Sequence, residues 1–197
     1  MKGKPTLYLL CGLPGSGKTT LAKRLEQETP ALRLTVDEWM TPLYGASICD
    51  PNTLDRWNMA HERVEKVQWQ IAERAFLLGV NVILDFGVWA REEREDFRSR
   101  AAALGARLEL IFLDEPLDEL KERVKARNEA PGHSAYPISE AELEQWWALF
   151  QRPSQAELEP RESAIAEISA SGSFASFAVI HGSFALSATH YLDKLSL

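Results

Sequence analysis

The chain has 197 residues, of which 45% are hydrophobic and 26% are charged, and its formal net charge is −7. This balance is typical of a globular domain that is large enough to bury a core. The acidic charge and the lack of a long basic run disfavour non-specific binding to duplex nucleic acid or to acidic membrane surfaces.

The two cysteines and the first apolar run bear on the compartment. Cys11 ends that run, and we expect it to pack in the core rather than to act in redox chemistry. The run leads directly into a glycine motif, which is not the pattern of a targeting segment. No run approaches the roughly 20 apolar residues that cross a bilayer. We therefore expect a cytoplasmic protein that does not enter a membrane.

Apolar runs alternate with segments of helical periodicity along the chain, which predicts strands joined through helices. One long helix is predicted from apolar residues spaced three or four apart, namely Val64, Val67, Ile71, Ala75 and Leu78. The expected elements are strands at 6–11, 32–36, 80–84 and 108–113, helices at 18–28, 55–78 and 90–104, a helix after Pro116, and a helix after a capping box of Ser139 and Glu142.

This alternation predicts an α/β fold with a mainly parallel sheet covered by helices on both faces. We expect one domain over residues 1–153 and a tail over 154–197 that is rich in Ser, Ala, Gly and Phe. Residues 177–181 are a candidate fifth strand, and the alternative is a weakly ordered tail.

Residues 12–19, GLPGSGKT, match the pattern G-x-x-x-x-G-K-[ST] in full, between a predicted strand and a predicted helix. The glycines allow successive backbone N–H groups to point at a phosphate, and the positive end of the helix favours an anion. In this motif Lys18 reaches the β- and γ-phosphates and Thr19 offers its hydroxyl to Mg²⁺. The pattern therefore predicts nucleotide binding rather than a turn used only for packing. The expected binding residues are Gly12, Leu13, Pro14, Gly15, Ser16, Gly17, Lys18, Thr19 and Thr20.

Three aspartates directly follow predicted strands, where ligands of parallel α/β sheets bind. Asp37 is a candidate general base for a substrate hydroxyl, and Asp85 is a candidate Mg²⁺ ligand. The assignment of these two roles between the two carboxylates stays open. Each aspartate is alternatively a helix N-cap or part of a turn at the strand end, and we favour the cap for Asp114 because Glu-Pro follows it.

Arg123 and Arg127 lie four residues apart, ahead of a loop with proline and glycine. They are candidates for a lid that neutralises a phosphoryl group and excludes water, and the alternative is a solvated helix face. Arg91 and Arg94 are weaker candidates, because alternating charges at a helix start are usually solvated.

Tryptophans and histidines carry weaker signals. Trp39, Trp57 and Trp89 are candidates for the wall of an organic substrate's pocket, although core packing is favoured for each. His61 and His133 are assigned no catalytic role. The sequence shows no Cys/His metal cluster and no nucleic-acid-binding signature.

The blocks GLPGSGKTTLAKRLE, TVDEW, GVNVILDFGVWAREER and IFLDEPLDELKERVKARN together resemble P-loop kinases allied to zeta toxins, chloramphenicol phosphotransferase and polynucleotide kinases. The resemblance covers residues 6–153. It implies a three-layer P-loop fold with five strands and a small helical lid, and transfer of the γ-phosphate of ATP, with Mg²⁺, to a hydroxyl.

The resemblance also implies roles for individual residues. Asp37 matches the second-strand general base, and Arg123 and Arg127 match lid arginines, with Asn128 completing the nucleotide-binding pair RN. Residues 150–153, FQRP, match a segment near the adenine. Beyond residue 153 nothing is matched.

These observations favour a kinase that phosphorylates a small-molecule hydroxyl, with Lys18, Asp37, Arg123 and Arg127 as its catalytic residues. A polynucleotide 5′-hydroxyl kinase is the first alternative, although the acidic charge counts against the basic, stacking channel that it needs. An ATPase or nucleotide switch with a protein partner is the second. The acceptor and the oligomeric state stay open.

Overall fold

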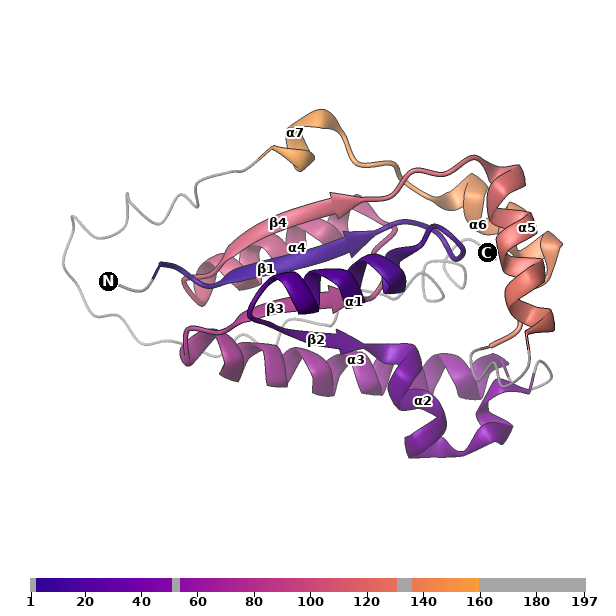
Figure 1. The fold of residues 1–197 in the computed structure, drawn as a ribbon, viewed down its shortest axis with the longest axis horizontal. Helices are drawn as coiled ribbons and strands as arrows, with labels where there is room; N and C mark the ends of the chain where they lie inside the picture. Colours follow the sequence, from indigo (N-terminus) through magenta and orange to yellow (C-terminus); the bar gives the residue numbers. More distant parts are fainter. Residues whose placement is uncertain (1–2, 51–53, 131–135, 160–197) are drawn as a thin grey trace.

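The computed structural model describes residues 3–50, 54–130 and 136–159 (Figure 1). Four strands form one parallel sheet in the order β2-β3-β1-β4. Their bounds are β1 Thr6–Cys11, β2 Ala31–Thr35, β3 Asn81–Asp85 and β4 Arg107–Phe112. The predicted α/β class with a parallel sheet is therefore confirmed, with four strands in the described part of the chain against the five expected. The candidate fifth strand at 177–181 lies outside the described residues.

Helices cover both faces of the sheet because its two central strands, β1 and β3, are buried on both faces. Leu10 and Ile83 pack on Ala22 of α1 (Lys18–Glu28) on one face. Residues that alternate with these, Leu9 and Leu84 among them, pack on the other face against α3 (Leu54–Leu77) and α4 (Arg91–Ala103). The result is the three-layer arrangement visible in Figure 1.

The remaining helices gather mainly at one end of the sheet. In Figure 1, α2 (Val36–Tyr44), α5 (Leu117–Glu129) and α6 (Glu140–Leu149) lie beyond the arrowheads of the strands. The short elements η1 (Ala46–Cys49) and α7 (Gln155–Leu158) complete the described chain. Ligands of parallel sheets bind at this carboxyl end, so this is where a site is expected.

Two details of the helices differ from the prediction. Helix α2 was not predicted, because Pro42 within it and its short length hide its periodicity. The apolar stripe predicted on α3 was partly wrong, since Val67 is 47% exposed and Leu78 is 76% exposed. The buried face instead includes Gln68, which is fully buried and donates a 3.2 Å hydrogen bond from Nε2 to the carbonyl of Thr35. A polar residue in the core escapes a pattern that counts only apolar residues.

Cys11 packs in the core as predicted. It is fully buried, and its thiol lies 3.0 Å from the carbonyl oxygen of Val88, to which it donates a hydrogen bond. Burial raises the pKa of this thiol to about 12, so it stays protonated. Among the described helices none has both the length and the apolar character that a membrane span requires.

Candidate functional site

A cavity of about 830 Å³ opens at the carboxyl end of the sheet. Its walls come from the loop after β1, the start of α2, the first half of α3, the segment after β3, and parts of α5 and α6. Strands β1 and β3 are neighbours, so the segments that follow them reach the cavity side by side. This brings residues that are far apart in the sequence into one site.

The loop after β1 has a backbone that side chains would disrupt. Gly12, Gly15 and Gly17 all have positive φ angles, of 149°, 85° and 92°. A Cβ at Gly12 would lie 2.8 Å from the carbonyl oxygen of Leu113, and one at Gly15 would lie 3.1 Å from that of Leu120 in α5. The glycines therefore permit both the curled backbone and the close approach of α5.

Lys18 curls back over this loop. Its Nζ donates a 2.8 Å hydrogen bond to the carbonyl of Leu13. Burial lowers the pKa of Lys18, while the carboxylates of Asp85 and Asp37 act in the opposite direction. The hydroxyl of Ser16 is buried and has no hydrogen-bond partner within the described part of the chain. A phosphate in the loop would give this donor an acceptor, so the loop fits a phosphate-bearing ligand.

Thr19 and Asp85 meet at the base of the cavity. The Thr19 hydroxyl donates a 2.6 Å hydrogen bond to Oδ2 of Asp85, and Thr35 Oγ1 lies 3.4 Å from the same oxygen. Burial raises the pKa of Asp85, against the lowering effects of the Thr19 hydrogen bond and the Lys18 charge. Hydroxyl and carboxylate oxygens suit Mg²⁺, so these residues fit the metal site that the sequence predicted.

Asp37 lies in the first turn of α2, is exposed, and lines the same cavity. Its negative charge acts to raise the pKa of three basic cavity residues from three different elements, Lys18, His61 and Arg127. In each of these residues burial is the larger effect and lowers the pKa. Asp37 is thus close enough to both Lys18, which follows the glycine loop, and Arg127 of α5 to interact with each electrostatically.

The two arginines of α5 line the cavity but differ in burial. Arg127 is half-buried, its Nη2 lies 3.4 Å from the carbonyl oxygen of Tyr136, and its buried Nε has no hydrogen-bond partner among the described residues. Burial lowers the pKa of Arg127. Arg123 is exposed, pairs with Glu115 at 3.2 Å, and contacts the carbonyl of Gly15 at 3.4 Å. The unpaired Nε of Arg127 points to a ligand more strongly than the paired Arg123 does.

The wall of the cavity away from the glycine loop is aromatic and acidic. Three of its residues lie four apart on α3: Trp57, His61 and Glu65. The Trp57 and His61 rings lie 4.6 Å apart between centroids, and His61 Nδ1 lies 3.4 Å from Oε1 of Glu65. Burial lowers the pKa of His61 and raises that of Glu65 well above its ordinary value.

The segment after β3 completes this wall with Trp89 and Glu93. The Glu93 carboxylate accepts a 3.1 Å hydrogen bond from the backbone N–H of Trp89. Burial raises the pKa of Glu93 to about 7, although hydrogen bonds from the Trp89 and Ala90 backbone oppose the shift. The Trp89 ring packs 5.2 Å from that of Trp146 in α6.

Residues 7–153 match a protein family described as an AAA domain. The chain belongs to this family. This match confirms the predicted resemblance at the level of the family, and it spans nearly the same residues as the predicted 6–153.

The chain is also similar to a curated enzyme and, in its fold, to solved structures. It is 37% identical over 123 residues to the bifunctional enzyme NodQ of Rhizobium tropici, a match that covers 61% of this chain and only 18% of NodQ. A chain of the Pnkp1/Rnl/Hen1 RNA repair complex has a TM-score of 0.59 at 21% identity, covering 90% of this chain and 54% of that one. A gluconokinase from Sinorhizobium meliloti has a TM-score of 0.51 at 16% identity, covering 77% and 78%. These two structures share the fold.

Some of the residues that the sequence predicted for the site lie away from the cavity. Asn128 binds the backbone of Ile138, donating at 2.7 Å and accepting at 3.4 Å, and is not among the cavity-lining residues. Asp114 pairs with Arg152 at 3.3 Å. It is not an N-cap, because Pro116 holds that position in α5.

The two candidate arginines after β3 do not line the cavity either. Arg91 is exposed, and Arg94 is only 2% exposed. Arg94 is therefore not the solvated residue that charge alternation suggests, and its buried partner is Glu157.

Sequence reasoning missed His61, Glu65 and Glu93, which line the cavity. The signal available on α3 was the spacing of Trp57, His61 and Glu65, four residues apart, which places them on one helix face. Which way this face points depends on the packing of α3, and the spacing does not show that. Of the three tryptophans weighed for a pocket wall, Trp57 and Trp89 line the cavity, whereas Trp39 packs against the core.

Proposed function

We propose that the protein is an ATP-dependent kinase that transfers the γ-phosphate to a hydroxyl of a small molecule. The observation that carries the proposal is the placement of Asp37 in one cavity with Lys18, Asp85 and Arg127. A carboxylate in reach of an acceptor, a phosphate loop and a lid cation are the parts that phosphoryl transfer requires.

The proposed step uses Asp37 as the general base. The acceptor hydroxyl gives its proton to the Asp37 carboxylate while its oxygen forms a bond to the γ-phosphorus. The bond between this phosphorus and the bridging oxygen to the β-phosphate breaks, and ADP leaves. Asp37 suits this role because it is exposed at the start of α2 and lines the cavity.

The other predicted residues stabilise charge in this proposal. Lys18 and Arg127 neutralise the negative charge on the transferred group, and Arg123 assists from the rim of the cavity. Thr19 and Asp85 would hold Mg²⁺, which, when bound, neutralises charge on the β- and γ-phosphates. The backbone of residues 12–20 cradles the phosphates.

The cavity wall favours a small organic acceptor over a nucleic acid strand. Trp57 and Trp89 offer ring faces, whereas Glu65 and Glu93 place carboxyl groups on the same wall. A nucleic acid strand binds in a basic groove, and the described residues of this wall, from α3 and from the segment after β3, include no lysine or arginine. A small neutral acceptor needs no such groove. Cys11 and Cys49 form no disulfide bond, which fits a cytoplasmic location.

Phosphate transfer from γ-labelled ATP to a panel of acceptors tests this function. The panel holds sugars, nucleosides, amino alcohols, antibiotics and a single-stranded oligonucleotide, with Lys18→Met as the inactive control. Labelling of a small molecule by the wild type but not by Lys18→Met supports the proposal. Labelling of the oligonucleotide alone identifies a polynucleotide kinase instead. Hydrolysis of ATP that a protein partner stimulates, without any labelled acceptor, identifies a nucleotide switch.

A further inference from the structure

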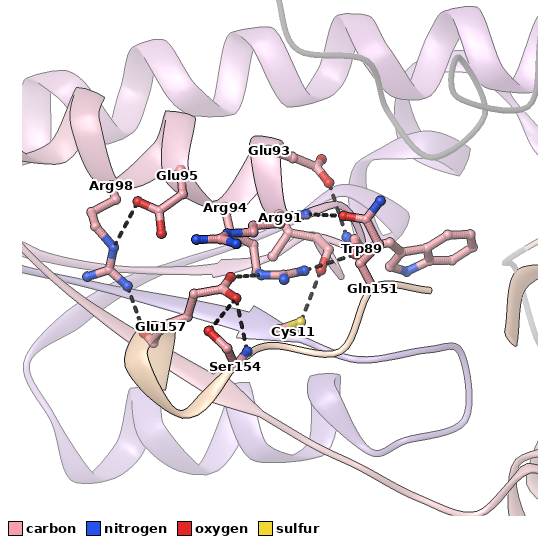
Figure 2. Close-up of polar contacts among 11 residues, drawn as sticks. Cys11, Trp89, Arg91, Glu93, Arg94, Glu95, Arg98, Gln151, Ser154 and Glu157 are labelled. Carbon is pink, nitrogen blue, oxygen red and sulfur yellow. Dashed lines mark hydrogen bonds and ion pairs between the residues drawn. The ribbon is translucent and has the colours of Figure 1, made fainter. Parts of the chain in front are cut away.

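An ion pair outside the cavity joins α4 to α7. Arg94 Nε and Glu157 Oε1 lie 2.9 Å apart, and both side chains are only 2% exposed (Figure 2). Glu157 belongs to α7, beyond the residues that match the AAA domain family. A fully buried ion pair between a kinase-like domain and a segment that follows it calls for a physical explanation.

Glu157 is held from several sides. Its Oε2 accepts hydrogen bonds from the N–H and the hydroxyl of Ser154, at 2.9 and 3.0 Å, and the bond from the N–H belongs to the capping box of α7. Its backbone carbonyl accepts a 2.8 Å hydrogen bond from Arg98 Nη2. Burial acts to raise the pKa of Glu157, but the hydrogen bonds from Arg94 and Ser154 outweigh it and hold the pKa below its ordinary value. Glu157 is therefore a charged, fixed anchor.

Arg94 connects this anchor to the cavity wall. Its Nη1 donates a 2.9 Å hydrogen bond to the carbonyl of Trp89, which also accepts one from the N–H of Gln151 at 3.2 Å. The N–H of Trp89 donates to Glu93. Figure 2 shows the Arg94 guanidinium between Glu157 and the Trp89 backbone. Both polar groups of Trp89's backbone are thus fixed, and the side chains that they orient, Trp89 and Glu93, line the cavity.

Stability alone is a weak explanation for this arrangement. Removing two charges from water costs so much that a buried ion pair often contributes less than well-packed apolar side chains of the same size. Arg94 also leaves Nη2 buried without a hydrogen-bond partner in the described chain. The fork of the guanidinium, however, is suited to binding two acceptors in fixed directions. Here those acceptors are the anchor and the cavity wall.

We propose that Glu157 is a positioning residue for the cavity: through Arg94 it fixes the backbone at Trp89, and so holds the Trp89 ring and the Glu93 carboxyl group on the acceptor side. The functional part of this inference rests on the proposed kinase function. The geometric part does not. The chain beyond the family match therefore contributes to the shape of the site.

Acrylamide quenching of Trp89 fluorescence tests the geometric part without an acceptor. The chain has six tryptophans, so the Trp89 signal is the difference between each variant and the same variant carrying Trp89→Phe. In Glu157→Gln we expect quenching of Trp89 to rise by about twofold, because its loop opens more often. The control is Glu159→Gln, an exposed residue two positions away, which should leave quenching unchanged.

The double variant Arg94→Met/Glu157→Leu separates position from stability. It fills the same space with apolar side chains, so we expect it to fold with a Tm close to that of the wild type. Its Trp89 should nevertheless be quenched as in Glu157→Gln. If the double variant folds and its Trp89 is quenched no more than in the wild type, the inference is wrong. This test holds even if Glu157→Gln does not fold.

Kinetics with an acceptor from the panel test the functional part. In Glu157→Gln we expect KM for the acceptor to rise by about tenfold, while KM for ATP stays within about twofold. Equal changes in both KM values would contradict a role on the acceptor side. If the wild type phosphorylates nothing in the panel, the proposed function fails, whereas the quenching result still decides the geometry.

Discussion

Thr19 Oγ1 and Asp85 Oδ2 lie 2.6 Å apart although 66 residues separate them in the sequence. The contact exists because β1 and β3 are neighbours in a parallel sheet, so the start of α1 and the end of β3 come together. A hydroxyl and a carboxylate oxygen at this distance can occupy two positions around one metal ion after a small rearrangement.

The change Asp85→Asn should uncouple nucleotide binding from Mg²⁺. Asparagine keeps an oxygen that accepts the Thr19 hydrogen bond but removes the charge that favours a divalent cation. Calorimetry with and without Mg²⁺ gives the gain in affinity for an ATP analogue on adding the metal. We expect this gain to be about tenfold smaller in Asp85→Asn than in the wild type. Asp114→Asn is the matched control, since Asp114 follows the end of β4 but lies outside the cavity. Equal Mg²⁺ dependence in both variants would contradict the assignment.

The change Asp37→Asn should slow transfer without weakening nucleotide binding. Removal of the general base is expected to lower kcat by about 10²–10⁴-fold, because the acceptor proton then has no adjacent carboxylate. The affinity for ATP should stay close to that of the wild type. The control is Glu38→Gln, which changes the next residue, a carboxylate paired with Arg33 at 2.9 Å. Transfer by Asp37→Asn at the wild-type rate would exclude Asp37 as the base.

The two lid arginines should differ in importance. Arg127 lines the cavity, and its buried Nε has no hydrogen-bond partner in the part of the chain that the structure describes, whereas Arg123 is 44% exposed and paired with Glu115. We expect Arg127→Met to lower kcat by about 10²–10³-fold, as the loss of a preorganised donor does. Arg123→Met should cost less than about fivefold, the usual worth of an exposed ion pair. Steady-state kinetics on both variants decide the order, and the reverse order would place Arg123 closer to the transferred group.

Gly87 supports Lys18 at a position that sequence reasoning did not single out. Its φ is +74°, and a Cβ there would lie 3.0 Å from Cε of Lys18. We expect Gly87→Ala to lose about 1 kcal/mol of stability from its left-handed backbone and also to weaken ATP binding by displacing Lys18. Gly105→Ala is a matched control, with φ +73° and nothing within 4 Å of its Cβ. It should lose similar stability and keep its affinity, so equal affinities in the two variants would contradict the support role.

The glycine loop and the strands were predictable because their signals are local. Residues 6–11 and 18–28 were predicted as they are found, since an apolar run and a helical period each show within a few residues. The loop between them is fixed by glycines whose backbone angles few other residues adopt. The phosphate side of the cavity therefore follows from a short stretch of sequence.

The acceptor side was not predictable in the same way because its contacts are distant in sequence. The local charge pattern predicts that Arg94 is solvated, whereas in the structure it is buried and bonded to Glu157, 63 positions later. His61 and Glu65 face the cavity only because the other faces of α3 pack against the sheet and α2. Gln68 shows the same limit, since its partner is the carbonyl of Thr35. These orientations are determined by tertiary packing, so no local sequence pattern predicts them.

Glu93 gives the cavity wall a charge that changes near neutral pH. Burial raises its pKa from 4.5 to about 7, so the folded protein holds this proton more tightly than the unfolded chain does. Glu93 should therefore contribute a loss of stability of up to about 3 kcal/mol as the pH rises from about 5 to 7. Glu93→Gln should lack this contribution and keep that of Glu65, whose pKa is also raised. Urea unfolding of both proteins between pH 5 and 8 measures the difference. Glu92→Gln, which alters the exposed neighbour, should follow the wild type. Parallel pH profiles for wild type and Glu93→Gln would show that Glu93 is ionised throughout, and the wall would then carry a permanent negative charge toward the acceptor.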